Sequence, residues 1–238
     1  RLSTFADEAY YLNGRLAMMS ENLLLGGILV AVVLGLFLNL KVACWVIIGI
    51  PISFAGAFWL MPSFDVTINV MSLFAFIMVL GIVVDDAIVI GESVYREVTS
   101  DYENKLAAGV EDADTYSASI ATVVAGTKRV AIPSTIGVLT TMAAFLPVVF
   151  AGGSFDGITR ALGIVVILCL AFSLIESKLI LPAHLVGLKI GEKSTGISGH
   201  IDRCRAHVSG KLDGFVNKTY LPKLRLALRN RYVTLAAF

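Results

Sequence analysis

Long stretches without a charged residue are the feature that most limits how this 238-residue chain can fold. A helix needs about 20 consecutive, mostly apolar residues to cross the hydrocarbon core of a bilayer. Five stretches approach or exceed this length, and each is a continuous apolar run rather than the alternating pattern of a membrane β-barrel strand. The sequence therefore predicts five transmembrane helices, at roughly 23–40, 44–61, 69–92, 130–150 and 159–181.

The composition excludes most other classes of protein. Apolar residues make up 57% of the chain and charged residues 16%, whereas soluble domains have about 45–50% and about 25%. A soluble globular protein with five buried core helices is therefore disfavoured, as are disordered, coiled-coil and collagen-like chains. Three cysteines cannot form a disulfide framework, and a net charge of +1 indicates no nucleic-acid or other acidic partner. The predicted fold class is all-α, a polytopic membrane helix bundle.

The distribution of lysine and arginine predicts how the bundle is oriented. In a five-span arrangement, 15 of the 19 basic residues fall on one side of the membrane. Cytoplasmic loops carry the excess of basic residues, so this side is predicted to be cytoplasmic and the segment before the first span external.

These assignments divide the chain into six segments. Apolar residues recur every three or four positions after residue 200, with basic residues between them, which predicts an amphipathic helix in the membrane interface. The final apolar run resembles the start of a further span, which indicates a piece of a longer membrane protein. The segments are an external lead-in (1–22), three transmembrane helices (23–92), a cytoplasmic loop with short helices near 103–108 and 115–124 (93–129), two transmembrane helices (130–181), a cytoplasmic linker with the interfacial helix (182–231) and the start of a truncated span (232–238).

Two adjacent carboxylates, Asp85 and Asp86, interrupt the third predicted span. A charged side chain inside a bilayer costs several kcal/mol, so such residues face the bundle interior and carry function. Adjacent positions differ by about 100° around a helix, so both can line one interior sector. Like charge and poor solvation favour the protonated acid, and a nearby cation favours the ionised form. The pair is therefore predicted to be a proton relay.

Small residues around the pair, Gly81, Ala87 and Gly91, are predicted to support close helix packing. Glu92 follows two turns after Asp85, and both a relay role and a snorkelling position at the span end stay open.

Late in the fifth span, Glu176 and Lys178 are interpreted as an interfacial pair that snorkels to the headgroups, with a second polar site as the alternative. Whether Glu176 takes part in proton transfer stays open. His200, Cys204 and His207 lie close together in the sequence, but no fourth ligand completes a zinc site, so no metal is predicted.

The block GIVVDDAIV at 81–89 resembles the fourth transmembrane helix of resistance-nodulation-division (RND) exporters, in particular their hydrophobe/amphiphile efflux branch. Four other blocks are similar to this family in order and spacing, so the resemblance covers essentially the whole chain. It equates the chain with the second to sixth transmembrane helices and the start of the seventh. The four blocks are GIPIS (49–53), NVMSLF (69–74), LPVVFAGG (146–153) and LPAHL (181–185).

The resemblance implies a secondary active transporter of the bacterial inner membrane rather than an enzyme. Such proteins have twelve spans in two pseudo-repeats, of which this chain would supply one half-repeat, and large external porter domains. They work as homotrimers, often with a periplasmic adaptor and an outer-membrane channel.

In this family proton influx drives the export of drugs, detergents or lipophilic solutes. Asp85 and Asp86 match the proton-carrying aspartates, with protons as the coupling ion and no cofactor. Their lysine partner belongs to the tenth helix, outside this chain, so the chain is expected to hold half a relay. The heavy-metal branch usually has a single aspartate here, so the pair favours organic substrates.

Two other functions compete with this prediction. A membrane scaffold or receptor would leave the cost of the intramembrane aspartates unexplained. An intramembrane aspartyl protease needs two carboxylates facing each other across a cleft, normally from different helices, whereas Asp85 and Asp86 are neighbours on one helix.

Overall fold

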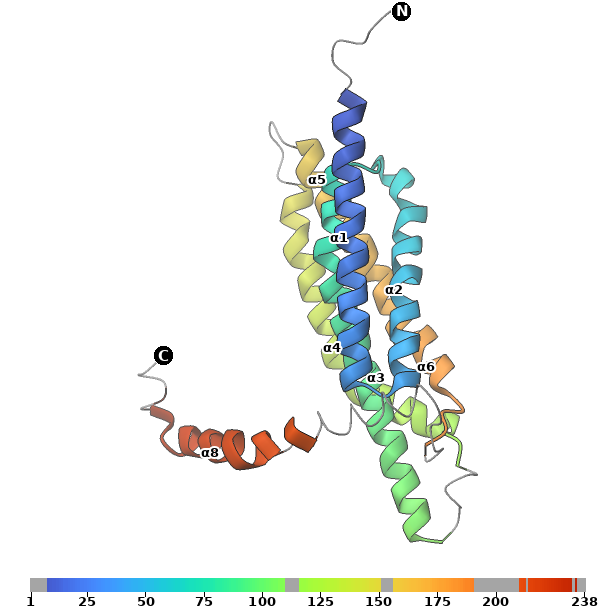
Figure 1. The fold of residues 1–238 in the computed structure, drawn as a ribbon, viewed down its shortest axis with the longest axis vertical. Coiled ribbons are helices and arrows are strands. Elements are labelled where there is room, and N and C mark those ends of the chain that lie inside the picture. Colours follow the sequence, from blue (N-terminus) through green and yellow to red (C-terminus); the bar gives the residue numbers. More distant parts are fainter. Residues whose placement is uncertain are drawn as a thin grey trace, which may run out of the picture.

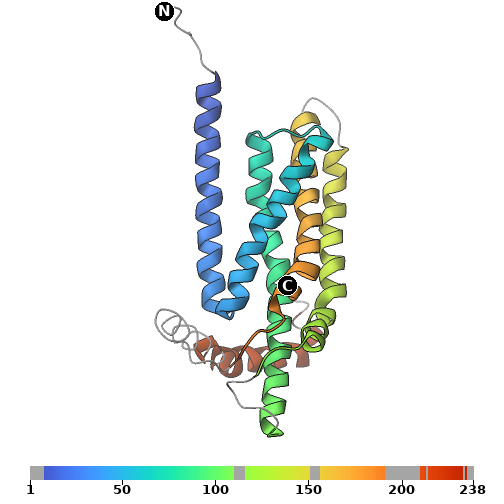
Figure 2. The ribbon, with the colours of Figure 1, turned by 90° about the vertical axis from the view of Figure 1, so that its right-hand side faces the viewer.

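The structure is a computed structural model that describes residues 8–109, 116–150, 156–190, 210–212, 214–232 and 234. Most of these residues are helical and none is in a strand, which confirms the all-α prediction. The long helices stand side by side in one bundle (Figures 1 and 2). The elements are α1 (Glu8–Phe37), α2 (Leu40–Leu60), η1 (Met61–Phe64), α3 (Val70–Ala107), α4 (Ile120–Val149), α5 (Asp156–Ile175), η2 (Glu176–Ile180), α6 (Leu181–Leu185), η3 (Val216–Tyr220) and α8 (Leu221–Arg229).

Five helical segments of the described chain are long and apolar enough to cross a membrane. Each contains most or all of one predicted span, so the hydropathy pattern located the helices and set their order. The segments are Asn13–Leu36, Leu40–Phe64, Val70–Ala107, Ile120–Val149 and Thr159–Leu185.

The predicted loop at 93–129 is mostly helical, which corrects its expected boundaries. Instead of two short helices, α3 continues to Ala107 and α4 already begins at Ile120. Contacts between the two extensions explain the difference: the Ser93 hydroxyl donates to the Gly126 carbonyl at 2.7 Å, and Arg129 pairs with Glu97 at 3.1 Å. Polar sequence marked the end of the apolar span but not the end of the helix.

Side-chain caps fix where three of the long helices begin. The Asn39 side chain accepts from the backbone N–H of Lys41 at the start of α2. Asn69 and Ser72 form a reciprocal capping box at the start of α3, and Ser119 accepts from the backbone N–H of Thr122 in α4. Each cap satisfies backbone N–H groups that have no partner within the first turn.

The core of the bundle lies where α2, α3 and α5 meet. Helix α3 contacts α1, α2, α4 and α5, and it contributes buried apolar residues along its length, among them Phe76, Val83 and Ile90. Helices α1 and α4 instead expose most of their apolar side chains. Such surfaces are suited to lipid, because a bilayer solvates apolar side chains without penalty.

The chain after the bundle is described only in part. Residues 191–209, which include most of the predicted amphipathic helix, lie outside the described residues. Further on, α8 carries exposed Leu226 and Leu228 among basic residues. Figure 1 shows α8 lying across the direction of the bundle helices, near the end at which α1 joins α2.

Candidate functional site

The two adjacent aspartates lie well inside α3. Asp86 follows Val70, the first residue of the helix, by sixteen positions, which places it about 24 Å along the helix axis. At this level α3 packs against α4 and the end of α5. The neighbours of Asp86 therefore come from distant parts of the chain.

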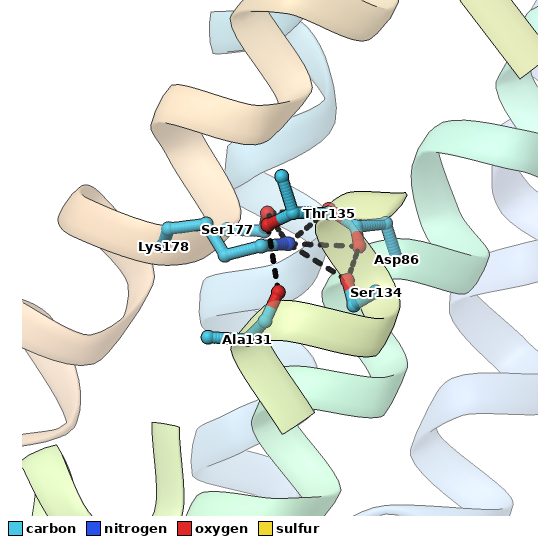
Figure 3. Close-up of polar contacts among 6 residues, drawn as sticks. All are labelled: Asp86, Ala131, Ser134, Thr135, Ser177 and Lys178. Atoms are coloured by element: carbon cyan, nitrogen blue, oxygen red, sulfur yellow. Dashed lines mark hydrogen bonds and ion pairs between the residues drawn. The ribbon is translucent and has the colours of Figure 1, made fainter. Parts of the chain in front are cut away.

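Asp86 is buried and forms an ion pair with Lys178 of η2 (Figure 3). The Lys178 Nζ lies 3.0 Å from each carboxylate oxygen of Asp86. Two hydroxyls complete the arrangement: Ser134 of α4 donates to Oδ1 and Ser177 of η2 donates to Oδ2. The ammonium group also donates to the oxygens of Ser134, at 2.8 Å, and Ser177, at 3.2 Å.

This network compensates Asp86 and Lys178 for the loss of water. Their side chains are only 4% and 15% exposed, and two buried charges are stable together only when further hydrogen bonds satisfy the remaining donors and acceptors. Hydrogen bonds to charged groups are the strongest in proteins. The cluster therefore ties α3, α4 and η2 together at one level of the bundle.

The wide turn η2 supplies two of the four side chains. Residues Glu176–Ile180 form one turn of π-helix, in which the backbone N–H of Leu181 donates to the Glu176 carbonyl five residues earlier. Pro182 follows and cannot donate a backbone hydrogen bond to the Lys178 carbonyl. Single π turns inside α-helices are often found at functional sites.

Asp85 lies on a different side of α3. It is exposed in this chain, as are Phe74, Gly81 and Val89. Because these four residues are separated by seven, four and four positions, they share one helix face, called here the outer face of α3. Within the described chain, Asp86 therefore lines the interior of the bundle and Asp85 does not.

Glu176 is a second buried carboxyl group near Asp86. It is 2% exposed, lies close enough to Asp86 and Lys178 for electrostatic interaction, and packs against Gly49 of α2. A side chain at position 49 would overlap the carboxyl group of Glu176. The interfacial interpretation of Glu176 and Lys178 is therefore corrected: both side chains turn into the bundle, because η2 packs against α2 and α3.

The small residues around the aspartates differ in their surroundings. Ala87 is buried, and a Cβ at Gly91 would lie 2.7 Å from Cγ1 of Val42, so α2 and α3 approach closely there. Gly81 instead has open space where a Cβ would point, so no helix of the described chain packs closely against it. Glu92 is partly exposed and pairs with Arg96 at 3.4 Å, one turn along the same helix.

Sequence reasoning missed Ser134 and Ser177 and placed Lys178 in the wrong environment. Serine is common in membrane helices, so neither hydroxyl stood out in the sequence. Lys178 lies near the end of an apolar run, where lysines usually reach the headgroups. The signal that could have identified it is the buried aspartate itself, since an intramembrane carboxylate requires a partner. His200, Cys204 and His207 lie outside the described residues.

The fold and the buried charges define the class of protein: a polytopic membrane protein of helices with an ion pair held between its spans. The chain belongs to the AcrB/AcrD/AcrF family of RND transporters, whose family profile matches residues 1–238. The predicted family is therefore confirmed, and the protein is of a transporter family rather than an enzyme family.

Individual relatives have low identity and are much longer than this chain. The chain is 27% identical over 218 residues to the swarming motility protein SwrC of Bacillus subtilis, covering 91% of this chain and 19% of that protein. It is 28% identical over 158 residues to the toluene efflux pump membrane transporter TtgE of Pseudomonas putida, covering 66% and 14%. It is also 28% identical over 236 residues to the cobalt-zinc-cadmium resistance protein CzcA of Cupriavidus metallidurans, covering 99% and 20%. The chain thus spans about a fifth or less of the length of these relatives.

Proposed function

We propose that this chain is part of a proton-driven exporter of lipophilic or amphiphilic compounds, in which Asp85 and Asp86 carry the protons. The observation that supports the proposal is the environment of Asp86: a carboxylate buried within a membrane span and held by an ammonium group and two hydroxyls from two other elements. Placing such a group within a membrane span costs free energy, and ionisable residues there are rare and mark functional sites.

The geometry suggests how protonation is coupled to movement. A proton added to Asp86 removes its charge and weakens the bonds from Lys178, Ser134 and Ser177. Because these residues belong to η2 and α4, the change shifts how these elements pack against α3. Two-state repacking of this type is how a local change in charge alters a whole bundle.

Asp85 has a complementary part in the proposal. It lies on the outer face of α3, where the described chain provides no contact that buries it. In this proposal the second half of the transporter, with the lysine of its tenth helix, lies against this helix. Asp85 would then receive its cationic partner from that half, whereas Asp86 has Lys178 within its own half.

The substrate class rests on the paired aspartates and on the relatives. TtgE is named as a toluene efflux pump, which favours lipophilic solutes. CzcA is named as a cobalt-zinc-cadmium resistance protein and aligns with 99% of this chain, so export of divalent metal cations is the second candidate. The adjacent pair Asp85-Asp86 is the feature that favours organic compounds.

The remaining parts of the proposal come from the family. A homotrimer in the bacterial inner membrane, joined by a periplasmic adaptor and an outer-membrane channel, would carry the compounds out of the cell. The proposed partners are thus the lipid bilayer and these proteins.

The test uses the full-length protein in a bacterial strain that lacks its own exporters. Expression should raise resistance to detergents, dyes and solvents and leave sensitivity to cobalt, zinc and cadmium salts unchanged. Asp86→Asn and Asp85→Asn should each abolish that resistance at unchanged expression. Wild-type resistance in either variant would refute the role of that aspartate, and resistance to the metal salts alone would favour the second candidate.

A further inference from the structure

Glu176 occupies a closed position between η2 and α2. It is 2% exposed, and its carboxyl group fills the space left by the missing side chain of Gly49. Glu176 is the first residue of the π turn that also presents Ser177 and Lys178 to Asp86. One turn of helix therefore places a second carboxyl group behind the ion pair.

The charges in this cluster do not balance if all three groups are ionised. Asp86 and Glu176 would contribute two negative charges and Lys178 one positive charge. Lys178 bonds to both oxygens of Asp86, whereas no hydrogen bond or ion pair to the Glu176 carboxyl is found within the described part of the chain. An uncompensated carboxylate in a buried, apolar position is strongly disfavoured. The neutral arrangement has one proton in the cluster, on Glu176.

The groups that face Glu176 from the neighbouring elements agree with this assignment. Asp86 of α3 and Lys178 of its own turn act on it electrostatically. On α6, His184 is exposed and bonded to the Ile180 carbonyl. Lys41 is the only charged residue of helix α2, and it lies two turns before Gly49. The charged residues of α5 lie near its first turn, at the end away from Glu176. No further cation among these elements is therefore placed to ionise Glu176.

Two buried hydroxyls extend the polar region from Glu176 along the bundle. Ser53 lies one turn after Gly49 on α2, and Ser173 lies one turn before Glu176 on α5. Both hydroxyl oxygens are buried without a hydrogen-bond partner in the described structure. Buried water usually binds to polar groups of this kind. Water at these two hydroxyls would connect Glu176 to a source of protons.

We propose that Glu176 is a second proton-binding carboxyl group, which exchanges one proton with Asp86. In one arrangement, which matches the hydrogen bonds of Lys178 in the structure, Glu176 holds the proton and Lys178 pairs with ionised Asp86. In the other arrangement the proton leaves the Glu176 carboxyl, Asp86 takes it up, and the Lys178 ammonium, keeping its three protons, pairs with ionised Glu176. The cluster is neutral in both arrangements, so neither leaves a charge unpaired in the membrane. This inference extends the proposed function and rests on it only for the role of the exchange in transport.

A metal cation at Glu176 fits the site less well than a proton. The ammonium group of Lys178 would repel it, and no group of three or more His, Cys, Asp or Glu side chains that could hold a metal ion occurs among the described residues. The experiment below therefore distinguishes binding of a proton at Glu176 from binding of a sodium ion.

Infrared difference spectroscopy of the full-length protein in liposomes tests the assignment. A protonated carboxyl group gives a C=O stretching band that disappears when the proton leaves. The wild-type protein should show this band at neutral pH, and Glu176→Gln should lose it because Asp86 stays ionised beside Lys178. Glu176→Asp should keep a band at a shifted frequency, which guards against a glutamine variant that does not fold. Glu92→Gln, which changes a partly exposed carboxyl group, is the matched control and should keep the wild-type band.

Three results would overturn the inference. They are the absence of a band at neutral pH, an unchanged band in Glu176→Gln, or a titration midpoint that moves when sodium is replaced by choline at constant ionic strength. The band is independent of transport. If Asp86→Asn abolishes resistance while Glu176→Gln keeps both resistance and the band, the proposed function stands and this inference fails. If Asp86→Asn keeps wild-type resistance while Glu176→Gln loses the band, the proton site stands and the proposed function fails.

Discussion

Asp85 and Asp86 are consecutive residues of α3 with the same side chain, yet the structure gives them opposite surroundings. Asp86 is buried and bonded to groups of α4 and η2, whereas Asp85 lies on the exposed outer face of α3. A rotation of about 100° between neighbours on a helix is enough to produce this difference. One carboxylate thus belongs to the packing within this half of the bundle, and the other is available to whatever lies against the outer face.

The largest effect on stability is expected when Lys178 is removed from the inner cluster, which is formed by Asp86, Lys178, Ser134 and Ser177. Lys178→Met leaves Asp86 without its ammonium partner and should lower the free energy of unfolding by about 3 kcal/mol, as is typical of a broken buried ion pair. In the 238-residue chain alone, where Asp85 is exposed, Asp85→Asn should change it by less than about 0.5 kcal/mol, as for other exposed positions. Chemical denaturation of the purified protein in detergent measures both. The double variant Lys178→Met/Asp86→Leu should recover much of the loss, and equal effects of the two single variants would contradict the comparison.

Two glycines, Gly49 of α2 beside the Glu176 carboxyl and Gly81 on the outer face of α3, give the next largest contrast in stability. Gly49→Ala would force a methyl group into the Glu176 carboxyl, and overpacking of this kind costs about 1–3 kcal/mol. Gly81→Ala meets open space and should instead stabilise the helix by about 0.5–1 kcal/mol, because alanine loses less backbone entropy. Thermal unfolding in detergent would show melting temperatures that move in opposite directions. A stabilising Gly49→Ala would mean that Glu176 is not packed against α2.

Removal of one hydroxyl from the inner cluster should have a smaller effect on the free energy of unfolding. Ser134→Ala deletes one of the bonds to Asp86 and should cost about 1 kcal/mol, a typical value for a single hydrogen bond. Thr140→Ala is the matched control on the same helix, since its exposed hydroxyl bonds only to the Ile136 carbonyl of its own helix. The same denaturation experiment should separate the two variants, and indistinguishable curves would argue against a bond from Ser134 to Asp86.

The smallest effect is expected at the exposed pair of Glu92 and Arg96. The two side chains are 43% and 73% exposed and lie one turn apart on α3. Such pairs contribute about 0.3–0.5 kcal/mol and are screened by salt. Arg96→Ala should therefore lower the free energy of unfolding by no more than this amount, and the loss should be smaller at high ionic strength. A loss comparable to that of Lys178→Met would show that charge pairs outside the core matter as much as those inside.

The sequence alone located the helices of the bundle. Free energies of transfer into a bilayer depend on each side chain and its near neighbours, so five apolar runs were enough to predict five spans, the all-α class and their order. The GIVVDDAIV block was also local, and it indicated the family before any contact was known. The same local signal could not give the true lengths of α3 and α4, because contacts such as that of Ser93 with Gly126 extend both helices beyond the apolar runs.

Only the tertiary structure decided which side chains meet. Asp86 contacts Ser134 and Lys178, which are 48 and 92 positions away in the sequence. No periodicity links residues so far apart, because their meeting depends on how three elements pack and on the π turn that directs Ser177 and Lys178 inward. The sequence indicated that a charge lies in the membrane, and packing determined that Asp86, unlike Asp85, has an ion-pair partner among the residues that the structure describes.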